Sequence, residues 1–342
     1  MADLPEIKFD NTPVITNSEI DCFMTCQVKH FFRYVRQIVS TRQEKAMDFG
    51  SAVHAGLAEW FKARLMGGSE EEIARNRAMD ATYATAQEIG LDSLEMEKAA
   101  AMVQMYTKAH FPEPFRWKVL DVEVTLSTTQ LVGNSYVIMS GKLDALLYDE
   151  ENHLVYILDH KTASSPNEDY YAKVAFDNQM HYYAAILERL LTQSESDESD
   201  AFRTKYDLPN DTKVGGFVYD VLTKPLIRQK KGESDGDFVE RYAEEFEKEG
   251  MFVRHEVSWT RDDNLFRVWR LTSITGTLGE IRDHLLCKKG PYPNTSSCLV
   301  YSGCPYFGLC KKCIDPYKVD ECDFGDEYAY RERHSELSNK PN

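Results

Sequence analysis

The sequence predicts an α/β protein in which helices flank a central mixed β-sheet, with a helical N-terminal part and a cysteine-rich C-terminal region. The first third of the chain has apolar residues at helical spacing, whereas strand-like segments alternate with helices from residue 118 onward. Five of the 8 cysteines lie between Cys287 and Cys313. The 342 residues contain no obvious linker, so we expect one domain that spans residues 1–342.

The helical N-terminal part is expected to extend over residues 16–110. Thr16 and Glu19 are spaced as in a capped helix start, and a helical pattern rich in Phe and Tyr follows them. Apolar residues recur on one helical stripe from Met47 to Leu65. A second helical region is predicted from Glu70 to about His110.

A core over residues 118–191 and a C-terminal part over residues 212–322 are expected to follow. Alternating or apolar runs between polar turns indicate strands, and amphipathic periodicity indicates helices. The Ser/Asp-rich stretch from Thr192 to Asp211 is expected to be a mobile loop. The predicted strands are residues 118–126, 135–147, 154–158, 214–222 and 252–259, and the accompanying helices are residues 172–191, 237–249 and 262–286.

The predicted hairpin before residue 160 carries two acidic residues. If it turns at Glu150 and Glu151, or one residue beyond, Asp144 lies opposite or nearly opposite Asp159. Their carboxylates would then share one face of the sheet, with Cβ atoms about 5 Å apart, close enough to bind one cation. The two-residue period of a strand puts Lys161 on that face too. Because burial of such charges is costly, a divalent cation with oxygen ligands, such as Mg²⁺, is the expected compensation.

Gly141 and Asp144, followed by an apolar strand that ends in Asp159-His160-Lys161, resemble the core motif of the PD-(D/E)xK nucleases. The ending Asp-His-Lys-Thr is similar to the RecB-type branch of that family. With the cysteines described below, the likeness covers roughly residues 16–313. It implies a restriction-endonuclease-like core and a metal-dependent nuclease activity.

Two further motifs occur in the order that this branch has. His54 is similar to its upstream helical histidine, and Gln179 and Tyr183 resemble its Gln-x-x-x-Tyr motif. By position, His54 flanks the apolar stripe of its helix, where it either offers a neutral imidazole to a metal or forms a buried hydrogen bond. Gln179 and Tyr183 lie one above the other on a helix, where they either bind a phosphate or a flipped-out nucleotide or pack against the sheet.

The resemblance also implies roles for these residues. Asp144 and Asp159, with the main-chain carbonyl of His160 and with His54, would hold one or two Mg²⁺ or Mn²⁺ ions. Lys161 would orient the attacking water or neutralise charge on the phosphate. The expected products carry a 5′-phosphate and a 3′-hydroxyl.

Four cysteines near the C-terminus, Cys298, Cys304, Cys310 and Cys313, are separated by five, five and two residues, which indicates a metal site in a reducing compartment. One arrangement is local, with these four thiolates around a structural Zn²⁺. In the other, Cys26 joins Cys298, Cys304 and Cys310 around a [4Fe-4S] cluster, with Cys313 as an alternative ligand. The second resembles the clamp of many RecB-type nuclease domains, although Tyr301 stands where that family has its preceding cysteine. The other cysteines are expected to be ordinary thiols: Cys22, Cys287 and Cys322.

Composition narrows the functional classes. With 40 basic and 56 acidic residues the net charge is −16, so any nucleic-acid contact must be local. The sequence has no apolar run of membrane-spanning length and no secretion signal, so we expect no membrane partner and a cytoplasmic location in a bacterial or phage-infected cell. It also lacks the phosphate-loop motif of a helicase motor.

We therefore interpret the chain as a metal-dependent deoxyribonuclease. The expected activity is that of an exonuclease on DNA ends or single strands, in recombination, repair or phage DNA processing, with a recombination or single-strand-binding protein as a partner. Two other classes stay open: a non-cleaving nucleic-acid-binding or assembly factor with a structural metal cluster, and a zinc-binding adaptor. DNA cleavage, the colour of the protein and the effect of changing Cys26 distinguish them.

Overall fold

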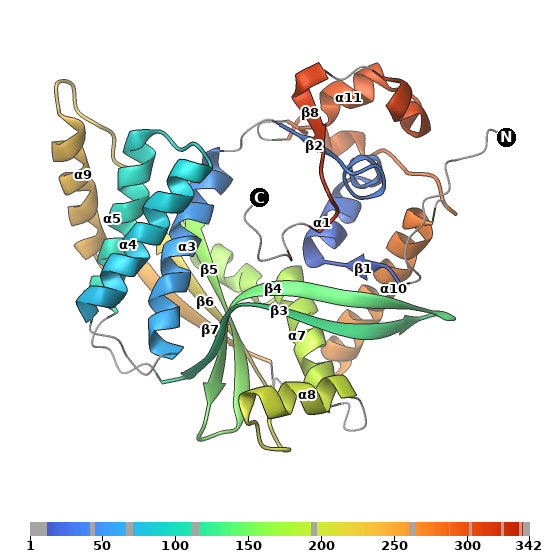
Figure 1. Ribbon diagram of the computed structural model, residues 1–342, viewed down its shortest axis with the longest axis horizontal. Coiled ribbons are helices and arrows are strands. Elements are labelled where there is room, and N and C mark those ends of the chain that lie inside the picture. Colours follow the sequence, from blue (N-terminus) through green and yellow to red (C-terminus); the bar gives the residue numbers. More distant parts are fainter. Residues whose placement is uncertain are drawn as a thin grey trace. The chain divides into compact units, whose positions relative to one another are not determined.

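The fold is that of a computed structural model (Figure 1), which describes residues 12–41, 45–65, 71–110, 116–192, 197–259, 264–286, 288–300, 303–322, 325–334 and 337. The chain forms two compact units. The terminal unit comprises Met1–Gln43, Thr125–Lys142 and Asp263–Asn342, and the central unit comprises Glu44–Val124 and Leu143–Asp262. The expectation of a single domain stays a prediction.

The described α-helices and β-strands alternate as expected after a helical first third. The helices are α1 (Asn17–Thr25), α2 (Gln27–His30), α3 (Lys45–Leu65), α4 (Glu71–Glu88), α5 (Ser93–Ala109), α6 (Glu168–Val174), α7 (Asn178–Thr192), α8 (Asp197–Tyr206), α9 (Asp235–Glu244), α10 (Asn264–Leu285) and α11 (Phe307–Lys312). The strands are β1 (Val14–Ile15), β2 (Ile38–Ser40), β3 (Lys118–Val132), β4 (Ser135–Asp149), β5 (Leu154–Ala163), β6 (Lys213–Thr223), β7 (Phe252–Ser258) and β8 (Tyr328–Tyr330).

The central unit is built on a mixed sheet. Strands β4 and β5 are antiparallel, β5 and β6 are parallel, and β6 and β7 are antiparallel. Figure 1 shows α3, α4, α5 and α9 on one side of β5, β6 and β7, and α7 and α8 on the other. Leu158 and Val218 point to the side of α3 and belong to the main apolar core with residues of α3, α4 and α5. The predicted α/β fold with a central mixed sheet flanked by helices is therefore confirmed.

The terminal unit joins segments from both ends of the chain. Strand β1 pairs in parallel with the outer part of β4, at Val14 with Ile138, and β2 pairs with β8. The predicted helix cap is confirmed, because the Thr16 hydroxyl accepts the N–H of Glu19 at 3.3 Å. The Glu19 carboxylate does not complete a capping box; it is fully buried in an ion network with residues from the C-terminal segment.

Two element predictions between β5 and β6 are wrong. Thr192–Asp211 was expected as a mobile loop, but it contains helix α8, because Phe202 and Tyr206 are one helical turn apart and bury their rings against each other. The predicted helix over residues 172–191 is two helices, α6 and α7. It breaks because the Asp177 carboxylate starts α7 by accepting the N–H groups of Gln179 and Met180, at 2.8 and 3.3 Å.

Candidate active site

The predicted hairpin register is confirmed in the central unit. Ala145 of β4 pairs with Leu158 of β5, and Asp149 pairs with Leu154. The next residues on the two strands are Asp144 and Asp159, so two acidic residues follow the last ladder pair on opposite strands. Because Leu158 belongs to the core with α3, the two-residue alternation puts Asp159 on the opposite face of the sheet.

The Asp144 carboxylate lies where β4 and β5 stop pairing. Its Oδ2 accepts the main-chain N–H of His160 at 2.7 Å, so a side chain replaces a main-chain carbonyl as the acceptor. Its Oδ1 lies 3.3 Å from Nδ1 of His54, which α3 carries toward the end of the sheet. The structure thus brings the predicted histidine into direct contact with the first predicted carboxylate.

The second carboxylate is paired with the predicted lysine. Lys161 Nζ lies 2.8 Å from Oδ2 of Asp159 and donates to Oε1 of Gln179 at 2.9 Å. Gln179 in turn donates from Nε2 to the Tyr183 hydroxyl at 3.2 Å. Gln179 and Tyr183 are one turn apart on the same face of α7, so Tyr183 contacts Gln179 and Gln179 contacts the Lys161 ammonium.

Burial and neighbouring charges shift the pKa values of Asp144 and Asp159 in opposite directions. Burial alone would raise the pKa of Asp144, but the charge and hydrogen bond of His54 and the N–H of His160 hold that pKa well below its usual range. Burial raises the pKa of Asp159 above its usual range, and the nearby Asp144 charge adds to it, in spite of the Lys161 ammonium. The site therefore combines one firmly ionised carboxylate with a second whose charge is poorly compensated.

The two basic residues respond to the same charges. Burial lowers the pKa of His54, but the Asp144 carboxylate outweighs it and raises that pKa to about 9. Burial likewise lowers the pKa of Lys161, and the charge of Asp159 raises it well above the usual lysine value. Lys161 is thus a permanently charged donor in this site and not a base.

The carboxylate pair fits a divalent cation. Oδ2 of Asp159 is buried and contacts Lys161 only as an ion pair, without a hydrogen bond of good geometry. A hard cation between Asp144 and Asp159 would compensate both acids through oxygen ligands. Among the residues that the structure describes, no three His, Cys, Asp or Glu side chains form a metal-binding group.

The His160 side chain leads to residues that the sequence reasoning missed. Its imidazole points to the face opposite Asp159 and is buried beside Asp220, with Nδ1 3.2 Å from Oδ2. Tyr106 donates its hydroxyl to the same Asp220 oxygen, and Arg254 Nε lies 3.5 Å from Oδ1. The available signal was Asp220 itself, the one charged residue inside the apolar run Val214–Leu222.

Burial would raise the pKa of Asp220, but this environment lowers it. The contact and charge of His160 act first, followed by the charge of Arg254 and the hydroxyl of Tyr106, and together they lower the pKa of Asp220 to about 2. A fully buried, ionised carboxylate therefore lies directly behind the candidate site.

The predicted cysteine site falls in the terminal unit. The main-chain N–H of Asn294 donates to Sγ of Cys26 at 3.4 Å, and the Asn294 side chain donates to the Thr25 carbonyl at 2.9 Å. Burial raises the pKa of Cys304, and the nearby thiols of Cys26 and Cys298 add to the increase. Segments from the two ends of the chain thus approach one another around Cys26.

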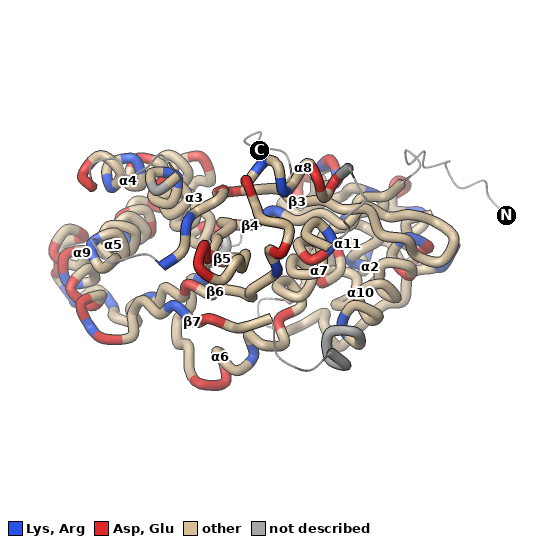
Figure 2. Tube along the Cα trace, turned by 90° about the horizontal axis from the view of Figure 1, so that it is seen from below, with Lys and Arg blue, Asp and Glu red and all other residues tan. Residues whose placement is uncertain are grey.

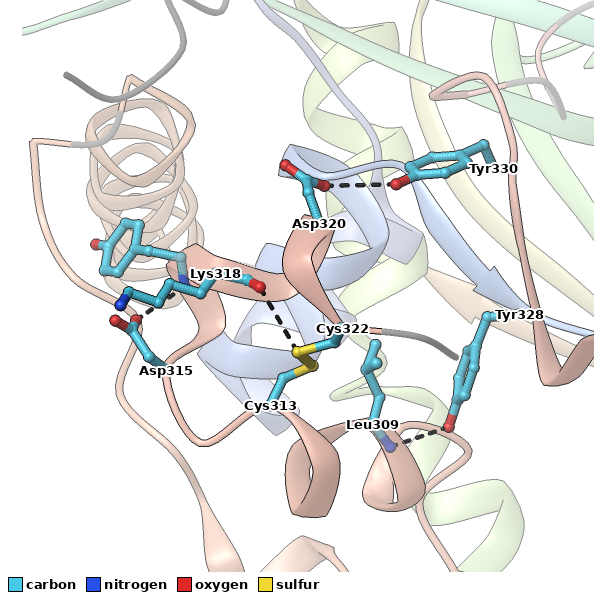
Figure 3. The surroundings of a disulfide bond; sticks show 9 residues. Leu309, Cys313, Asp315, Lys318, Asp320, Cys322, Tyr328 and Tyr330 are labelled. Carbon is cyan, nitrogen blue, oxygen red and sulfur yellow. Dashed lines mark hydrogen bonds between the residues drawn. A yellow bond between two sulfur atoms is a disulfide. The ribbon is translucent and has the colours of Figure 1, made fainter. Parts of the chain in front are cut away.

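Two cysteine predictions are wrong. The sequence predicted Cys313 as an alternative cluster ligand or as the fourth ligand of a local zinc site, and it predicted Cys322 as an ordinary thiol. In the structure the two residues form a disulfide (Figure 3). The turn between them folds back, with the Asp315 side chain accepting the Tyr317 N–H at 3.1 Å, so that the two Cα atoms are 6.2 Å apart. The local four-cysteine zinc site lacks its fourth thiolate in this structure.

Charge is mixed over the surface elements. Figure 2 shows acidic and basic positions interspersed along α4, α5 and α9, in agreement with the sequences of these helices. A broad basic face is therefore not found on these elements. Every helix within the described ranges is too short or too polar to span a lipid bilayer.

Comparison with known proteins adds a family. A family model described as "PD-(D/E)XK nuclease superfamily" matches residues 14–311 of this chain. A search of curated proteins finds no match. Among solved structures, the crystal structure of SSO0001 is similar to this chain, with a TM-score of 0.28 and 10% sequence identity over 80% of this chain and 87% of that chain. A likeness at that level carries no functional argument, whereas the family match spans the whole candidate site.

Proposed function

This chain belongs to the PD-(D/E)XK nuclease superfamily, and we propose that it is a metal-dependent deoxyribonuclease whose active site contains Asp144, Asp159 and Lys161. One observation carries the proposal: two carboxylates follow the last pair of the β4–β5 ladder, and an ammonium lies 2.8 Å from one of them. Such a group can hold a divalent cation and a phosphate at the same place.

Each side chain has a task that follows from its contacts. Asp144 and Asp159, with the His160 carbonyl, would bind Mg²⁺ or Mn²⁺, and His54 would be a ligand in its neutral form, after the proton that Asp144 holds on it has left. When bound, the ion supplies a water of lowered pKa and positive charge beside the phosphate. Lys161, held charged by Asp159, would donate to the water or to a phosphate oxygen.

Gln179 and Tyr183 support this arrangement in the proposal. Gln179 accepts from the Lys161 ammonium and so limits the positions that it can take, and Tyr183 limits the Gln179 amide. A fixed donor at the place where charge develops lowers the barrier more than a mobile one. Direct contacts of either side chain with a phosphate or an unstacked base are compatible with the same positions.

For the substrate we propose DNA ends or single strands, cut by an exonuclease that leaves a 5′-phosphate and a 3′-hydroxyl. The net charge of −16 supports local contact with a strand over broad coating of a duplex. Trimming of DNA ends is a step in recombination, repair and phage DNA processing. We therefore propose a role in one of these processes in the bacterial or phage-infected cell, beside a single-strand-binding or recombination protein.

The test uses end-labelled linear DNA and closed circular DNA, each with Mg²⁺ or Mn²⁺. The wild-type protein is expected to degrade the linear molecule and to spare the circle, whereas Asp159→Ala and Lys161→Ala lose cleavage and stay folded. Lys205→Ala is the matched control, because Lys205 Nζ also lies 2.8 Å from a carboxylate, that of Asp121, in an exposed pair. Retained cleavage in Asp159→Ala would refute the assignment. Folded wild-type protein that binds DNA without cutting it would favour the non-cleaving alternative.

We also propose that Cys26, Cys298, Cys304 and Cys310 hold a [4Fe-4S] cluster with a structural role. Asn294 supports this proposal, because it bonds to Cys26 and to the Thr25 carbonyl and is followed closely by Cys298. The thiols also act on each other, since Cys26, Cys298 and Cys304 all add to the raised pKa of Cys310. Four thiolates at such a junction suit a cluster that joins the two ends of the chain.

Anaerobic purification and iron analysis test the cluster. Wild-type protein is expected to be brown and to contain iron, and Cys26→Ser is expected to lose both. Cys22→Ser is the matched control, because Cys22 is a buried thiol on α1, four residues before Cys26, and belongs to no proposed cluster. A colourless wild-type protein with bound zinc, or iron that is retained in Cys26→Ser, would contradict the proposal.

A further inference from the structure

A row of charged side chains crosses three strands directly behind the candidate active site. In the parallel β5–β6 ladder His160 is the partner of Asp220, and in the antiparallel β6–β7 ladder Asp220 is the partner of Arg254. Partners in adjacent strands present their side chains on the same face. His160, Asp220 and Arg254 therefore form one continuous row on the face that packs against α3 and α5.

The row is buried at His160 and Asp220, whereas the Arg254 side chain at its end is 16% exposed. His160 is 2% exposed, and Asp220 and Tyr106 are 0% exposed. Tyr106, from α5, closes the row by donating to Asp220 and by accepting from Arg254 Nη2 at 3.1 Å. Asp220 is thus in contact with charged or polar groups from three directions: His160, Arg254 and Tyr106.

Buried charged side chains are less favourable in a core than apolar side chains of similar size. Removal of charges from water costs several kcal/mol per ion, and apolar residues of similar size are often as stabilising or more so. The neighbouring positions on the same face, Leu158 and Val218, are apolar and fully buried. Fold stability alone would be served by another apolar pair where His160 and Asp220 stand.

The row has a direct connection to the site through one residue. The main-chain N–H of His160 donates to Oδ2 of Asp144 at 2.7 Å, while the side chain of the same residue contacts Asp220. His160 also lies between Asp159 and Lys161 on β5, so its main chain fixes where both of these side chains begin. No ladder pair with β4 holds the strand at this point, because the last one is Ala145 with Leu158.

We infer that Asp220 is a positioning residue: it anchors the His160 side chain from behind the sheet and thereby holds Asp144 and Asp159 at the spacing that binds the metal ion. The inference rests on the proposed function, and it concerns residues that neither touch substrate nor bind the ion. It assigns Tyr106 and Arg254 to the same anchor, because both hold Asp220 in place. Side chains beyond metal ligands commonly change metal affinity or activity by about 10–100-fold when they are replaced.

The test measures Mn²⁺ binding to the DNA-free full chain by electron paramagnetic resonance, together with cleavage at limiting and saturating Mn²⁺. Asp220→Asn keeps the shape and removes the charge. We expect it to raise the Kd for Mn²⁺ about 10-fold or more. Cleavage at saturating Mn²⁺ is expected to recover. Tyr106→Phe, which removes only a hydroxyl, is expected to shift the Kd in the same direction by a smaller factor and serves if Asp220→Asn does not fold.

Two control variants separate positioning from loss of stability. Val218→Ala removes buried volume from the same strand and face, so a purely structural effect would raise its Mn²⁺ Kd as well. Asp211→Asn alters an Asp–His pair of this unit away from the site, in which the exposed His153 lies 2.9 Å from Asp211. Both are expected to bind Mn²⁺ as the wild type does. Because Asp220 acts through His160, Asp220→Asn is expected to cause no further increase of the Mn²⁺ Kd when His160→Gln is already present.

The outcomes distinguish this inference from the proposed function. If Asp159→Ala abolishes Mn²⁺ binding while Asp220→Asn and Tyr106→Phe bind within twofold of wild type, the positioning role is overturned and the nuclease assignment stands. An equal Kd increase in Val218→Ala and Asp220→Asn overturns it as well. Mn²⁺ binding that Asp159→Ala leaves unchanged overturns both.

Discussion

Replacement of Gly56 by alanine tests how closely helix packing controls the site. Gly56 lies on α3, two residues after His54, where α3 meets α4 and α5. A Cβ at this position would lie 2.2 Å from the Thr82 hydroxyl, 2.9 Å from the Ala78 carbonyl oxygen and 3.1 Å from Val103 Cγ1. Two of these atoms cannot retreat easily, because one is main chain and the Thr82 side chain is fully buried. The helix itself would have to move.

The expected loss of stability follows from two opposing contributions. Alanine favours a helix over glycine by about 1 kcal/mol. Overpacking of a filled core costs about 1–3 kcal/mol, and the overlap here is severe enough for the upper part of that range. We therefore expect Gly56→Ala to lower the free energy of unfolding by about 1–2 kcal/mol. A shift of α3 would also lengthen the 3.3 Å contact of His54 with Asp144, and a misplacement of about 1 Å can reduce a rate about 100-fold.

Urea denaturation followed by circular dichroism measures the first effect, and the initial rate of DNA cleavage measures the second. Gly276→Ala is the matched control, since Gly276 is also helical but a Cβ there meets nothing within 4 Å. That variant is expected to be as stable as the wild type or up to about 1 kcal/mol more stable. Thr82→Ala removes the nearest atom and is expected to recover part of the loss in the double variant. If Gly56→Ala is as stable as Gly276→Ala, the packing argument is wrong.

Two further predictions concern the terminal unit and the lysine. Burial and the neighbouring His30 lower the pKa of His284 to about 4, so the unfolded chain binds the extra proton first as the pH falls below about 6.5. The free energy of unfolding is expected to fall by up to about 3 kcal/mol as the pH falls from about 6.5 to about 4. In His284→Asn the urea midpoint is expected to change less with pH over this range, and an equal pH dependence in variant and wild type would contradict the prediction. Gln179→Leu removes an acceptor from Lys161 and is expected to lower the single-turnover cleavage rate about 10-fold, whereas Tyr183→Phe, one contact further away, has a smaller effect; the reverse order would contradict it.

The parts of the fold that the sequence predicted are those with strong local patterns. Strands β4 and β5 have long apolar or alternating runs around an acidic turn, and these fix both the hairpin and its register. Strands β1, β2 and β8 have two or three residues each, too few for alternation to be visible. Helix α8 was missed because its apolar stripe is only Phe202 and Tyr206 within a polar segment.

The same distinction holds for the site. The turn and the alternation of the hairpin predicted that Asp144, Asp159 and Lys161 lie together, whereas only the likeness to family motifs joined His54, Gln179 and Tyr183 to them. The row behind the site depends on the parallel pairing of β5 with β6. These strands are separated by 49 residues, and no local sequence pattern predicts the register of their pairing. Only a charged residue in an apolar strand pointed to it.

An ion network in the terminal unit predicts how that unit responds to loss of the cysteine site. The buried Glu19 carboxylate lies 2.6 Å from Arg333 Nη2, 2.9 Å from His30 and 3.1 Å from His334, so it ties the N-terminal helices to the C-terminal segment without any metal. Glu19→Ala removes the buried carboxylate that faces the Arg333 guanidinium, and breaking a buried ion pair in this way typically costs about 3–5 kcal/mol.

Cys26→Ser, by contrast, leaves the Glu19 network intact. We therefore expect that Cys26→Ser loses iron but that its terminal unit keeps most of its resistance to proteolysis. In Glu19→Ala the terminal unit is expected to become sensitive to proteolysis, although the cysteines are unchanged. Limited proteolysis of both full-length variants, with the fragments identified by mass spectrometry, makes the comparison. If Cys26→Ser becomes as sensitive as Glu19→Ala, the ion network alone does not hold the chain ends together, because Arg333 and Glu19 are still joined in Cys26→Ser.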